Sequence, residues 1–418
     1  MNINLQRTVD HVVGVPLCRI LSAWERLRRK REPLVPPRRI LIILLSEMGS
    51  LVLAQPMFMR LRERYPHASL HVMLFAKNRE TLDLLNAVPP ENVIAVSDRS
   101  FFSFAADCVR VLREFFSSPF DIVIDCELFA RVSSIFAYLS GAPVRVGFSP
   151  YTQEGLYRGS FINRPVLYNP YRHMTEQFLT MAAAIDAVSL PPAKNVGRLE
   201  FSRPPFLQFS QDELRQVGGQ LFADFPGIRG KRLVLLYVSG GVLPIRAWPL
   251  ASYVKLCRIL LDEGYAVGVI GVAEDKQYGA TIKDRCESAS CIDLTGYTKS
   301  VRHLMALFHF ADLLISNDGG PGHFAALTPI SSIVLFGPET PTLYRPLNPN
   351  SYCVYLQLAC SPCLTAYNHR NSPCDGDNQC LKQITIEQVS AKAREMLTHR
   401  EEGSDLTTYY ESTGTSNS

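Results

Sequence analysis

The sequence predicts an α/β protein of two domains, each with a parallel β-sheet covered by helices. Two series of short apolar strand segments alternate with amphipathic helix segments, one within residues 38–195 and the other within 232–385. This alternation is typical of βαβ units, in which a helix links two parallel strands. A length of 418 residues suits two or three domains. The proline-containing stretch 196–231 is predicted to be the interdomain connection.

Strands are predicted at apolar runs, and helices where apolar residues recur three and four positions apart. In the first series the strands are 40–45, 70–75, 93–96, 121–125 and 144–148, and the helices are 51–65, 80–87, 104–116, 131–139 and 175–187. In the second series the strands are 233–238, 266–270, 313–316 and 333–336, and the helices are 249–264, 301–311 and 322–327. A last helix is expected at 386–400, before a disordered tail at 401–418, and the stretches 149–175, 188–231 and 338–383 are predicted to be irregular. We therefore expect two Rossmann-like halves facing each other across a cleft.

The composition limits the classes of function. Hydrophobic residues make up 47% and charged residues 20% of the chain, as in ordinary globular proteins. The net charge of +4 argues against a dedicated nucleic-acid-binding protein. The sequence holds no run of about 18 apolar residues, which argues against an ordinary transmembrane helix.

Residues 1–37 form a basic N-terminal extension. A helix is predicted from Val12 to Arg31, with an apolar side that carries Trp24 and with a basic end. Such a helix can lie on an anionic membrane surface, and it can equally pack on its own domain. Both interpretations remain open. The segment lacks the features of a secretory signal peptide, so we expect a reducing compartment.

The strongest motif for chemistry follows the strand 313–316 and opens the next helix. It reads Ser-Asn-Asp-Gly-Gly-Pro-Gly-His and contains Asp318, Gly319, Gly320, Gly322 and His323. Glycines let a ligand approach the backbone, and N–H groups at the start of a helix can bind a diphosphate. Because Asp318 and His323 add two functional side chains there, we interpret the segment as a binding site rather than as an ordinary capped turn.

A second motif follows the strand 233–238. Ser239, Gly240 and Gly241 offer hydrogen-bond donors for a phosphate, and Arg246 offers a guanidinium that can pair with it through two N–H groups. Taken alone, this segment is equally well explained as a loop with a surface arginine.

Three further charged residues lie near the ends of predicted strands. Glu47 follows the first strand and can act as a general base. Glu274 follows the strand 266–270 and can accept hydrogen bonds from a ribose, and Arg131 can bind an anionic acceptor. Each also has a structural explanation: a helix start for Glu47, a helix cap for Glu274 and a salt bridge for Arg131.

The sequence contains eleven cysteines, many for an enzyme of a reducing compartment. Six are expected to be small core residues: Cys18, Cys108, Cys126, Cys257, Cys286 and Cys291. In the predicted loop 353–380, four others offer thiolates for a structural zinc ion: Cys360, Cys363, Cys374 and Cys380. Only the first pair has zinc-ribbon spacing, so reduced thiols and disulfides remain the alternatives.

Together these segments resemble glycosyltransferase family 9, the heptosyltransferase-like glycosyltransferases, over about residues 38–400. One marker is the motif Ser316–His323, and a second is Leu335–Pro341, which reads Leu-Phe-Gly-Pro-Glu-Thr-Pro. Arg246–Pro249 reads Arg-Ala-Trp-Pro, and Met48-Gly49 precedes a predicted helix that ends in Arg-Tyr-Pro. The set is specific, whereas each motif alone is not.

The resemblance implies a GT-B fold and an inverting, metal-independent sugar transfer from a nucleotide-diphosphate donor, typically ADP-heptose. The usual acceptor is the growing inner core of lipopolysaccharide at the cytoplasmic face of the inner membrane. A cytoplasmic enzyme, peripheral to that membrane and with no catalytic cofactor, is therefore implied.

Residue roles follow from the same resemblance. Donor binding is assigned to Ser239, Gly240, Gly241, Glu274, Gly319, Gly320, Gly322 and His323. Asp318 borders the donor as a catalytic candidate, and Arg246 stands where the family usually has a lysine that neutralises the leaving phosphate. Arg131 falls where a basic residue can meet the acceptor.

One position departs from the family pattern. The family's opening motif usually reads Met/Ile-Gly-Asp, and that aspartate is the presumed base, but here the position is Ser50. Ser50 is then predicted to contact the acceptor, and Glu47, three residues earlier on the same turn, is the candidate base. A catalytically degenerate nucleotide-sugar-binding protein and a transferase for another donor sugar remain alternatives. A nucleotide-dependent oxidoreductase is disfavoured because no Gly-x-Gly-x-x-Gly follows the first strand.

Overall fold

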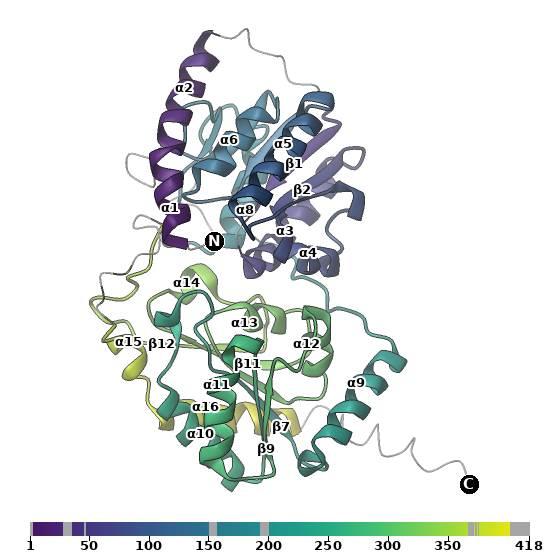
Figure 1. The fold of residues 1–418 in the computed structure, drawn as a ribbon, viewed down its shortest axis with the longest axis vertical. Coiled ribbons are helices and arrows are strands. Elements are labelled where there is room, and N and C mark those ends of the chain that lie inside the picture. Colours follow the sequence, from purple (N-terminus) through teal and green to yellow (C-terminus); the bar gives the residue numbers. More distant parts are fainter. Residues whose placement is uncertain are drawn as a thin grey trace. The chain divides into compact units, whose positions relative to one another are not determined.

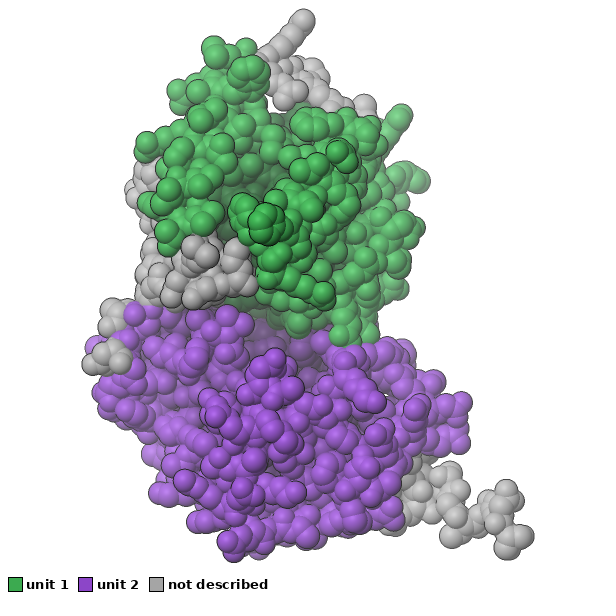
Figure 2. All heavy atoms as spheres, viewed as in Figure 1, with its two compact units in different colours: residues 1–203, 365–371 green, residues 204–364, 372–418 purple. Residues whose placement is uncertain are grey.

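The structure is a computed structural model that describes residues 3–27, 36–45, 47–149, 157–192, 200–366, 372, 374 and 376–401 (Figure 1). The chain divides into two compact units (Figure 2). Unit 1 contains residues 1–203 and 365–371, and unit 2 contains residues 204–364 and 372–418. Each unit is built around one six-stranded parallel sheet, so the predicted α/β class is confirmed. None of the helices within the described ranges combines the length and apolarity needed to span a membrane.

The sheet of unit 1 has the strand order β3-β2-β1-β4-β5-β6, and all neighbouring strands are parallel. The strands are β1 (Arg39–Ile43), β2 (Ser69–Phe75), β3 (Val93–Val96), β4 (Ile122–Asp125), β5 (Val144–Phe148) and β6 (Arg164–Val166). The first five match the prediction. β6 lies in the stretch 149–175 that was predicted to be irregular. It was missed because it is a three-residue edge strand with a central proline.

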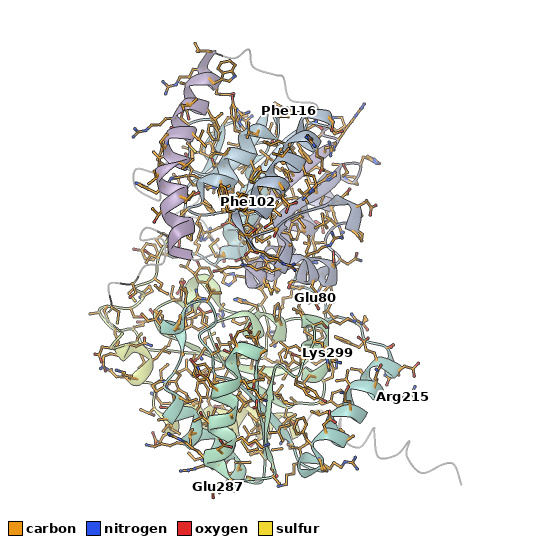
Figure 3. All side chains as sticks on the ribbon, viewed as in Figure 1. Glu80, Phe102, Phe116, Arg215, Glu287 and Lys299 are labelled. Atoms are coloured by element: carbon orange, nitrogen blue, oxygen red, sulfur yellow. The ribbon has the colours of Figure 1, made fainter. Side chains whose placement is uncertain are left out.

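Helices pack around the strands of unit 1. They are α3 (Met48–Arg64), α4 (Arg79–Leu85), α5 (Phe101–Ser117), α6 (Arg131–Leu139) and α8 (Met174–Ala184), with short 3-10 helices η1 (Ala76–Asn78) and η2 (Pro90–Asn92). In α5, Val111 and Phe115 are buried, whereas Phe102 and Phe116, which are labelled in Figure 3, are exposed.

The N-terminal extension forms two helices, α1 (Ile3–Val12) and α2 (Gly14–Leu27), instead of the single predicted helix. α2 packs on α6, and Cys18 and Ser22 are buried. The extension therefore does pack on its own domain. Its other side exposes an apolar stripe of Val12, Val13, Leu17, Ile20, Trp24 and Leu27. The predicted basic end, residues 28–31, lies outside the described residues.

A carboxylate of α1 closes the start of α6. Asp10 accepts hydrogen bonds from the backbone N–H groups of Arg131 at 2.9 Å and Val132 at 3.0 Å. It also pairs with the Arg131 guanidinium at 3.2 Å, while Arg131 donates to the Tyr157 carbonyl at 3.1 Å. The Arg131 side chain is only 2% exposed. Since the N-cap residue Ala130 has no side-chain oxygen, Asp10 supplies the cap from 121 residues away.

The sheet of unit 2 has the order β12-β11-β10-β7-β8-β9, again entirely parallel. The strands are β7 (Leu233–Tyr237), β8 (Ala266–Gly271), β9 (Cys291–Thr295), β10 (Leu313–Asn317), β11 (Ser331–Phe336) and β12 (Ser351–Tyr355). β9 was not predicted, and the irregular stretch predicted at 338–383 is wrong over β12. Both are edge strands. No residue of β12 is fully buried, which gives it a weak apolar pattern. β9 buries four of its five residues, but Asp293 and Thr295 interrupt its apolar sequence.

The helices of unit 2 are α9 (Gln211–Asp224), α10 (Leu250–Asp262), α11 (Lys276–Cys286), α12 (Val301–Phe308), α13 (Gly320–Ala325), α14 (Pro341–Tyr344), α15 (Gln379–Lys382) and α16 (Ile386–Glu401). Three short 3-10 helices are η3 (Pro226–Ile228), η4 (Pro244–Arg246) and η5 (Ala273–Asp275). The prediction of irregular structure at 188–231 is wrong over α9, a polar helix in which Leu214, Gly218 and Leu221 are the buried positions. α11 was not predicted, and its buried residues are only Gly279 and Ile282.

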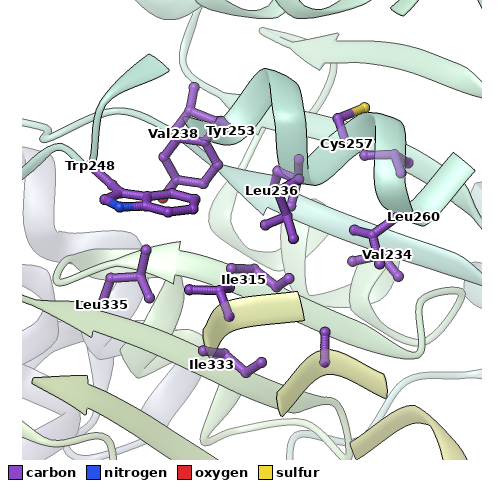
Figure 4. Packing of buried hydrophobic residues seen from close by; sticks show 14 of the residues in the cluster. Val234, Leu236, Val238, Trp248, Tyr253, Cys257, Leu260, Ile315, Ile333 and Leu335 are labelled. Carbon is purple, nitrogen blue, oxygen red and sulfur yellow. The ribbon is translucent and has the colours of Figure 1, made fainter. Parts of the chain in front are cut away.

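The two faces of this sheet have different roles. On one face, Leu236, Ile315 and Leu335 of the strands pack with Tyr253 and Trp248 in a core that also includes α10 and α16 (Figure 4). α13 packs on the other face: a Cβ added at Gly322 would lie 3.2 Å from Val334, which alternates with Ile333 and Leu335 along β11. Glycine at position 322 thus permits the close approach of α13 to the sheet.

Replacing Asp10 with alanine should lower the free energy of unfolding of unit 1 by about 3–5 kcal/mol, because the buried Arg131 guanidinium loses its counter-charge. Hydrogen exchange of the α6 amides and urea unfolding measure the effect. Asp212→Ala is the matched control, since Asp212 pairs with Arg215 on an exposed surface and should leave stability unchanged. Equal α6 protection in wild type and Asp10→Ala would show that the cap does not stabilise this helix.

Candidate active site

The predicted donor residues follow strands that are neighbours in the sheet of unit 2. Glu274 follows β8, Ser239 and Arg246 follow β7, and Asp318 follows β10. Because the strands are parallel, their carboxyl ends meet at one edge, where ligands bind in open α/β sheets. The order β10-β7-β8 therefore gathers segments that lie up to 79 residues apart along the chain.

Arg246 is the cationic centre of this edge. It ends η4, its side chain is 13% exposed, and its guanidinium contacts Glu339 at 2.9 Å and Asp318 at 3.6 Å. The Asp318 and Glu339 carboxylates are 7% and 2% exposed. The two carboxylates hold the guanidinium in one place. The structure therefore brings Arg246 and Asp318 together, as the sequence predicted.

A buried amide joins the segments around Arg246. Asn317 is fully buried, and its side-chain oxygen accepts from the backbone N–H of Trp248 at 3.0 Å and from the Tyr253 hydroxyl at 2.9 Å. Its side-chain nitrogen donates to the Ser239 carbonyl at 3.1 Å. One residue at the end of β10 thus fixes the loop after β7 on both sides of Arg246.

The two glycine segments also lie close to each other, with Tyr237 between them. A Cβ added at Gly241 would lie 3.3 Å from the Tyr237 hydroxyl, and one added at Gly319 would lie 3.5 Å from its ring. Gly241 has a φ of 60°, which favours glycine, and its N–H donates to the Ser239 hydroxyl at 3.1 Å. Burial raises the pKa of the Tyr237 hydroxyl, which therefore stays protonated.

Other donor candidates lie along the same edge. Gly319 is the N-cap of α13, Gly320 and Gly322 lie in its first turn, and His323 follows, 7% exposed. Glu274 lies in η5 and is exposed, while its neighbour Asp275 is buried and accepts from the Val272 N–H at 3.1 Å. Glu274 is thus accessible to a ligand, and Asp275 holds its turn in place.

In unit 1, Glu47 and Ser50 lie at the start of α3. Glu47 is the N-cap residue and Ser50 is the third residue of the helix, both partly exposed. The loop before them is fixed by Glu127, which accepts from the Leu45 N–H at 2.7 Å, and by Asn78, which donates to the Leu45 carbonyl at 2.7 Å. The two residues therefore share one helical turn, as the candidate base and the acceptor contact require.

Two predicted sites have less support from the geometry. Arg131 is buried under α1, so a direct contact with an acceptor would need α1 to move, and this role stays a prediction. Burial and the neighbouring Cys363, Cys360 and Cys374 raise the pKa of Cys380 to about 11. Among the described residues, however, the thiols close enough to share one cation are Cys257, Cys286 and Cys291. The zinc assignment to the four loop cysteines also stays a prediction.

Comparison with known proteins decides the family. Residues 108–372 match the model of glycosyltransferase family 9 (heptosyltransferase). This match covers more than half of the chain.

The chain belongs to glycosyltransferase family 9.

Its relatives include lipopolysaccharide heptosyltransferase 2 of Escherichia coli (strain K12), which is 24% identical over 376 residues, 87% of this chain and 99% of the relative. Lipooligosaccharide heptosyltransferase 2 of Haemophilus ducreyi is 24% identical over 334 residues, 76% of this chain and 88% of the relative. The solved structure of E. coli ADP-heptose lipopolysaccharide heptosyltransferase II has a TM-score of 0.66 at 21% identity and covers 87% of this chain and 99% of that chain. The GT-B fold and the glycosyltransferase class are therefore confirmed.

Two residues of this family 9 site were not assigned a role from the sequence. Glu339 lies in the Leu335–Pro341 marker, just after β11. Its position after the carboxyl end of a strand, like that of Asp318, could have identified it as a site residue. Asn317 ends β10, where an amide inside an apolar strand signalled a buried hydrogen-bonding role. Both act by holding Arg246 or its loop in place.

Replacing Asn317 with alanine should destabilise unit 2 by about 2–5 kcal/mol, because the buried Trp248 N–H loses its acceptor and two further hydrogen bonds disappear. Tyr253→Phe is the matched control: it removes only one hydroxyl of the same network and should cost about 1 kcal/mol. Thermal and urea unfolding measure both. Equal losses in the two variants would contradict a central role for Asn317.

Proposed function

We propose that this family 9 glycosyltransferase moves heptose from ADP-heptose to a lipopolysaccharide-core acceptor, with inversion and without a catalytic metal ion. The observation that carries the proposal is the convergence of Arg246, Asp318 and two glycine segments at one edge of the unit 2 sheet. The sugar and the acceptor are supported by the relatives, which are named as heptosyltransferases of lipopolysaccharide or lipooligosaccharide. The nucleotide is supported by the structural neighbour named for ADP-heptose.

The proposed site holds the donor by its diphosphate and ribose. Backbone N–H groups of Gly319, Gly320 and Gly322 and the Ser239–Gly241 loop donate to phosphate oxygens. Glu274 accepts from the ribose hydroxyls, and Asp318 and His323 border the donor. The close packing of the two glycine segments around Tyr237 supports one shared diphosphate site rather than two.

Arg246 stabilises the leaving group. As the sugar–phosphate bond breaks, negative charge grows on the departing ADP, and a preorganised cation lowers the energy of that state. Glu339 and Asp318 keep the guanidinium oriented. This charge stabilisation supplies what a divalent ion provides in metal-dependent transferases.

Glu47 acts as the base. Its carboxylate takes the proton of an acceptor hydroxyl while that oxygen forms a bond to the anomeric carbon. The bond to ADP breaks on the opposite side of that carbon, which inverts its configuration. Ser50, on the same turn, binds the acceptor. The position of Glu47 at the N-cap of α3, three residues before Ser50, supports this division of roles.

Activity assays with ADP-heptose and a lipopolysaccharide-core acceptor test the proposal. Glu47→Gln should lower kcat about 10²–10⁴-fold while ADP binding is unchanged, and the exposed Glu91→Gln is its control.

Arg246→Met should lower kcat about 10²–10³-fold, whereas Arg246→Lys, which keeps the charge, should retain most activity. Activity should persist in EDTA, and NMR should show an inverted anomeric linkage. Donor binding without transfer by the wild type would favour the degenerate binding protein instead.

We also propose that the enzyme is cytoplasmic and lies on the inner membrane through its N-terminal extension. The apolar stripe of α1 and α2 supports this, since Ile20 and Trp24 are each 62% exposed and Leu27 is 85% exposed. Arg19 and Arg26 are exposed on the same helix, and Arg28–Arg31 follow in the sequence. Apolar side chains beside basic ones are typical of helices that bind anionic lipid surfaces.

The double variant Ile20→Gln/Trp24→Gln should bind phosphatidylglycerol-containing vesicles at least tenfold more weakly than wild type, because both side chains contribute buried apolar area. Co-sedimentation measures the binding. Val188→Gln/Leu190→Gln, which changes two exposed apolar residues elsewhere in unit 1, is the control and should bind normally. Equal binding of the wild type to neutral phosphatidylcholine vesicles would contradict the electrostatic part.

A structural zinc ion at Cys360, Cys363, Cys374 and Cys380 remains part of the proposal. It would take no part in sugar transfer, and metal analysis of the purified protein tests it.

A further inference from the structure

Three cysteines that were predicted to be separate core residues lie close together in unit 2. Cys257 comes from the middle of α10, Cys286 from the end of α11 and Cys291 from the start of β9. Their sulfur atoms all lie within 4.8 Å of one another, and those of Cys257 and Cys291 are 3.6 Å apart. Figure 4 shows Cys257 on α10 above the core side chains of the sheet. We propose that these three thiols form a binding site for a soft monovalent cation, with Cu(I) as the best fit.

The spacing of the sulfur atoms suits a metal ion. A cation bonded to three sulfurs in a plane at about 2.3 Å each holds them about 4.0 Å apart. The observed separations of 3.6 Å and up to 4.8 Å bracket this value. A disulfide would need a sulfur–sulfur distance of about 2.05 Å. Small side-chain rotations are therefore enough to close the site around a cation.

The donor set selects the cation. Thiolates prefer soft ions such as Cu(I), which is stable with three sulfur ligands. Zinc prefers four ligands. In the described part of the chain, no His, Asp or Glu joins these sulfurs at the same distance. Three sulfurs without a fourth protein ligand favour the three-coordinate soft ion.

Burial and access also fit such a site. Cys257 and Cys291 are 0% and 1% exposed and belong to the apolar core of unit 2, whereas Cys286 is half-buried at its margin. An ion can therefore enter beside Cys286 and reach two thiols that are shielded from water. Exclusion of water protects Cu(I) from exchange and oxidation.

Two positively charged side chains lie near the thiols. Lys283 and Arg258 lie close enough to stabilise the thiolates of Cys291 and Cys286, respectively. When the cation binds, the three thiols release their protons to solvent and form three metal–sulfur bonds, with no change in oxidation state.

The site is separate from sugar transfer. Cys291 is the first residue of β9, so the thiols lie near the amino ends of the strands, whereas Arg246 and Asp318 follow their carboxyl ends. A bound cation would join α10, α11 and β9, and its removal would leave the transfer chemistry intact. The inference therefore does not depend on the proposed function.

Titration of the reduced full-length protein with Cu(I) under argon, in competition with bicinchoninate, tests the inference. The four loop cysteines are first replaced by serine so that they do not compete. This protein should bind one Cu(I), with three sulfurs at about 2.3 Å by X-ray absorption.

Cys286→Ser should weaken Cu(I) binding at least 100-fold. This variant changes the half-buried ligand and spares the two core thiols, so it should fold. Cys108→Ser, a half-buried cysteine in unit 1, is the control and should bind as before. No bound Cu(I), or equal affinity in Cys286→Ser and its parent, would overturn the proposal, as would tighter binding of Zn(II) than of Cu(I).

Discussion

The site of unit 2 depends on one buried amide. Asn317 bonds to the Trp248 N–H, the Tyr253 hydroxyl and the Ser239 carbonyl, which come from the loop after β7 and from α10. Leaving these polar groups unpaired in the core would cost about 1–3 kcal/mol each. The loop that carries Arg246 is therefore fixed to the end of β10, beside Asp318. The hydrogen bonds of Asn317 and the ion pairs with Glu339 and Asp318 together determine the position of the guanidinium.

A fixed guanidinium suits the chemistry of a leaving diphosphate. Charge stabilisation is effective when the donor groups are already oriented before charge develops, because little reorganisation is then needed. The two carboxylates also offset the charge of the arginine. In the proposed mechanism, an incoming diphosphate competes for a guanidinium that is already held in place.

Much of this could be predicted from the sequence. Buried parallel strands such as β1 and β10 are nearly continuous apolar runs, and the motifs at their carboxyl ends identified Asp318 and Arg246 as neighbours. β6, β9 and β12 are edge strands with weaker patterns, and α9 is stabilised by few buried side chains, so tertiary contacts determine them. The cap of α6 by Asp10 joins residues 121 positions apart, and no local pattern encodes such a pair.

The cysteines show the same limit. The spacing of Cys360 and Cys363 predicts a metal site, whereas Cys257, Cys286 and Cys291 were predicted to be separate core residues. Their convergence results from the packing of α10 and α11 beside β9, which itself was not predicted. Long-range packing, rather than motif spacing, brings these sulfurs together.

A crystal structure of the protein with bound ADP, solved at a resolution that shows the phosphate oxygens, would test the role of Arg246 directly. We expect the diphosphate to lie within hydrogen-bond distance of Arg246 and of the Gly319–Gly322 amides, with the ribose beside Glu274 and no metal ion between the phosphates. A diphosphate bound away from Arg246, or held through a divalent cation, would contradict this role.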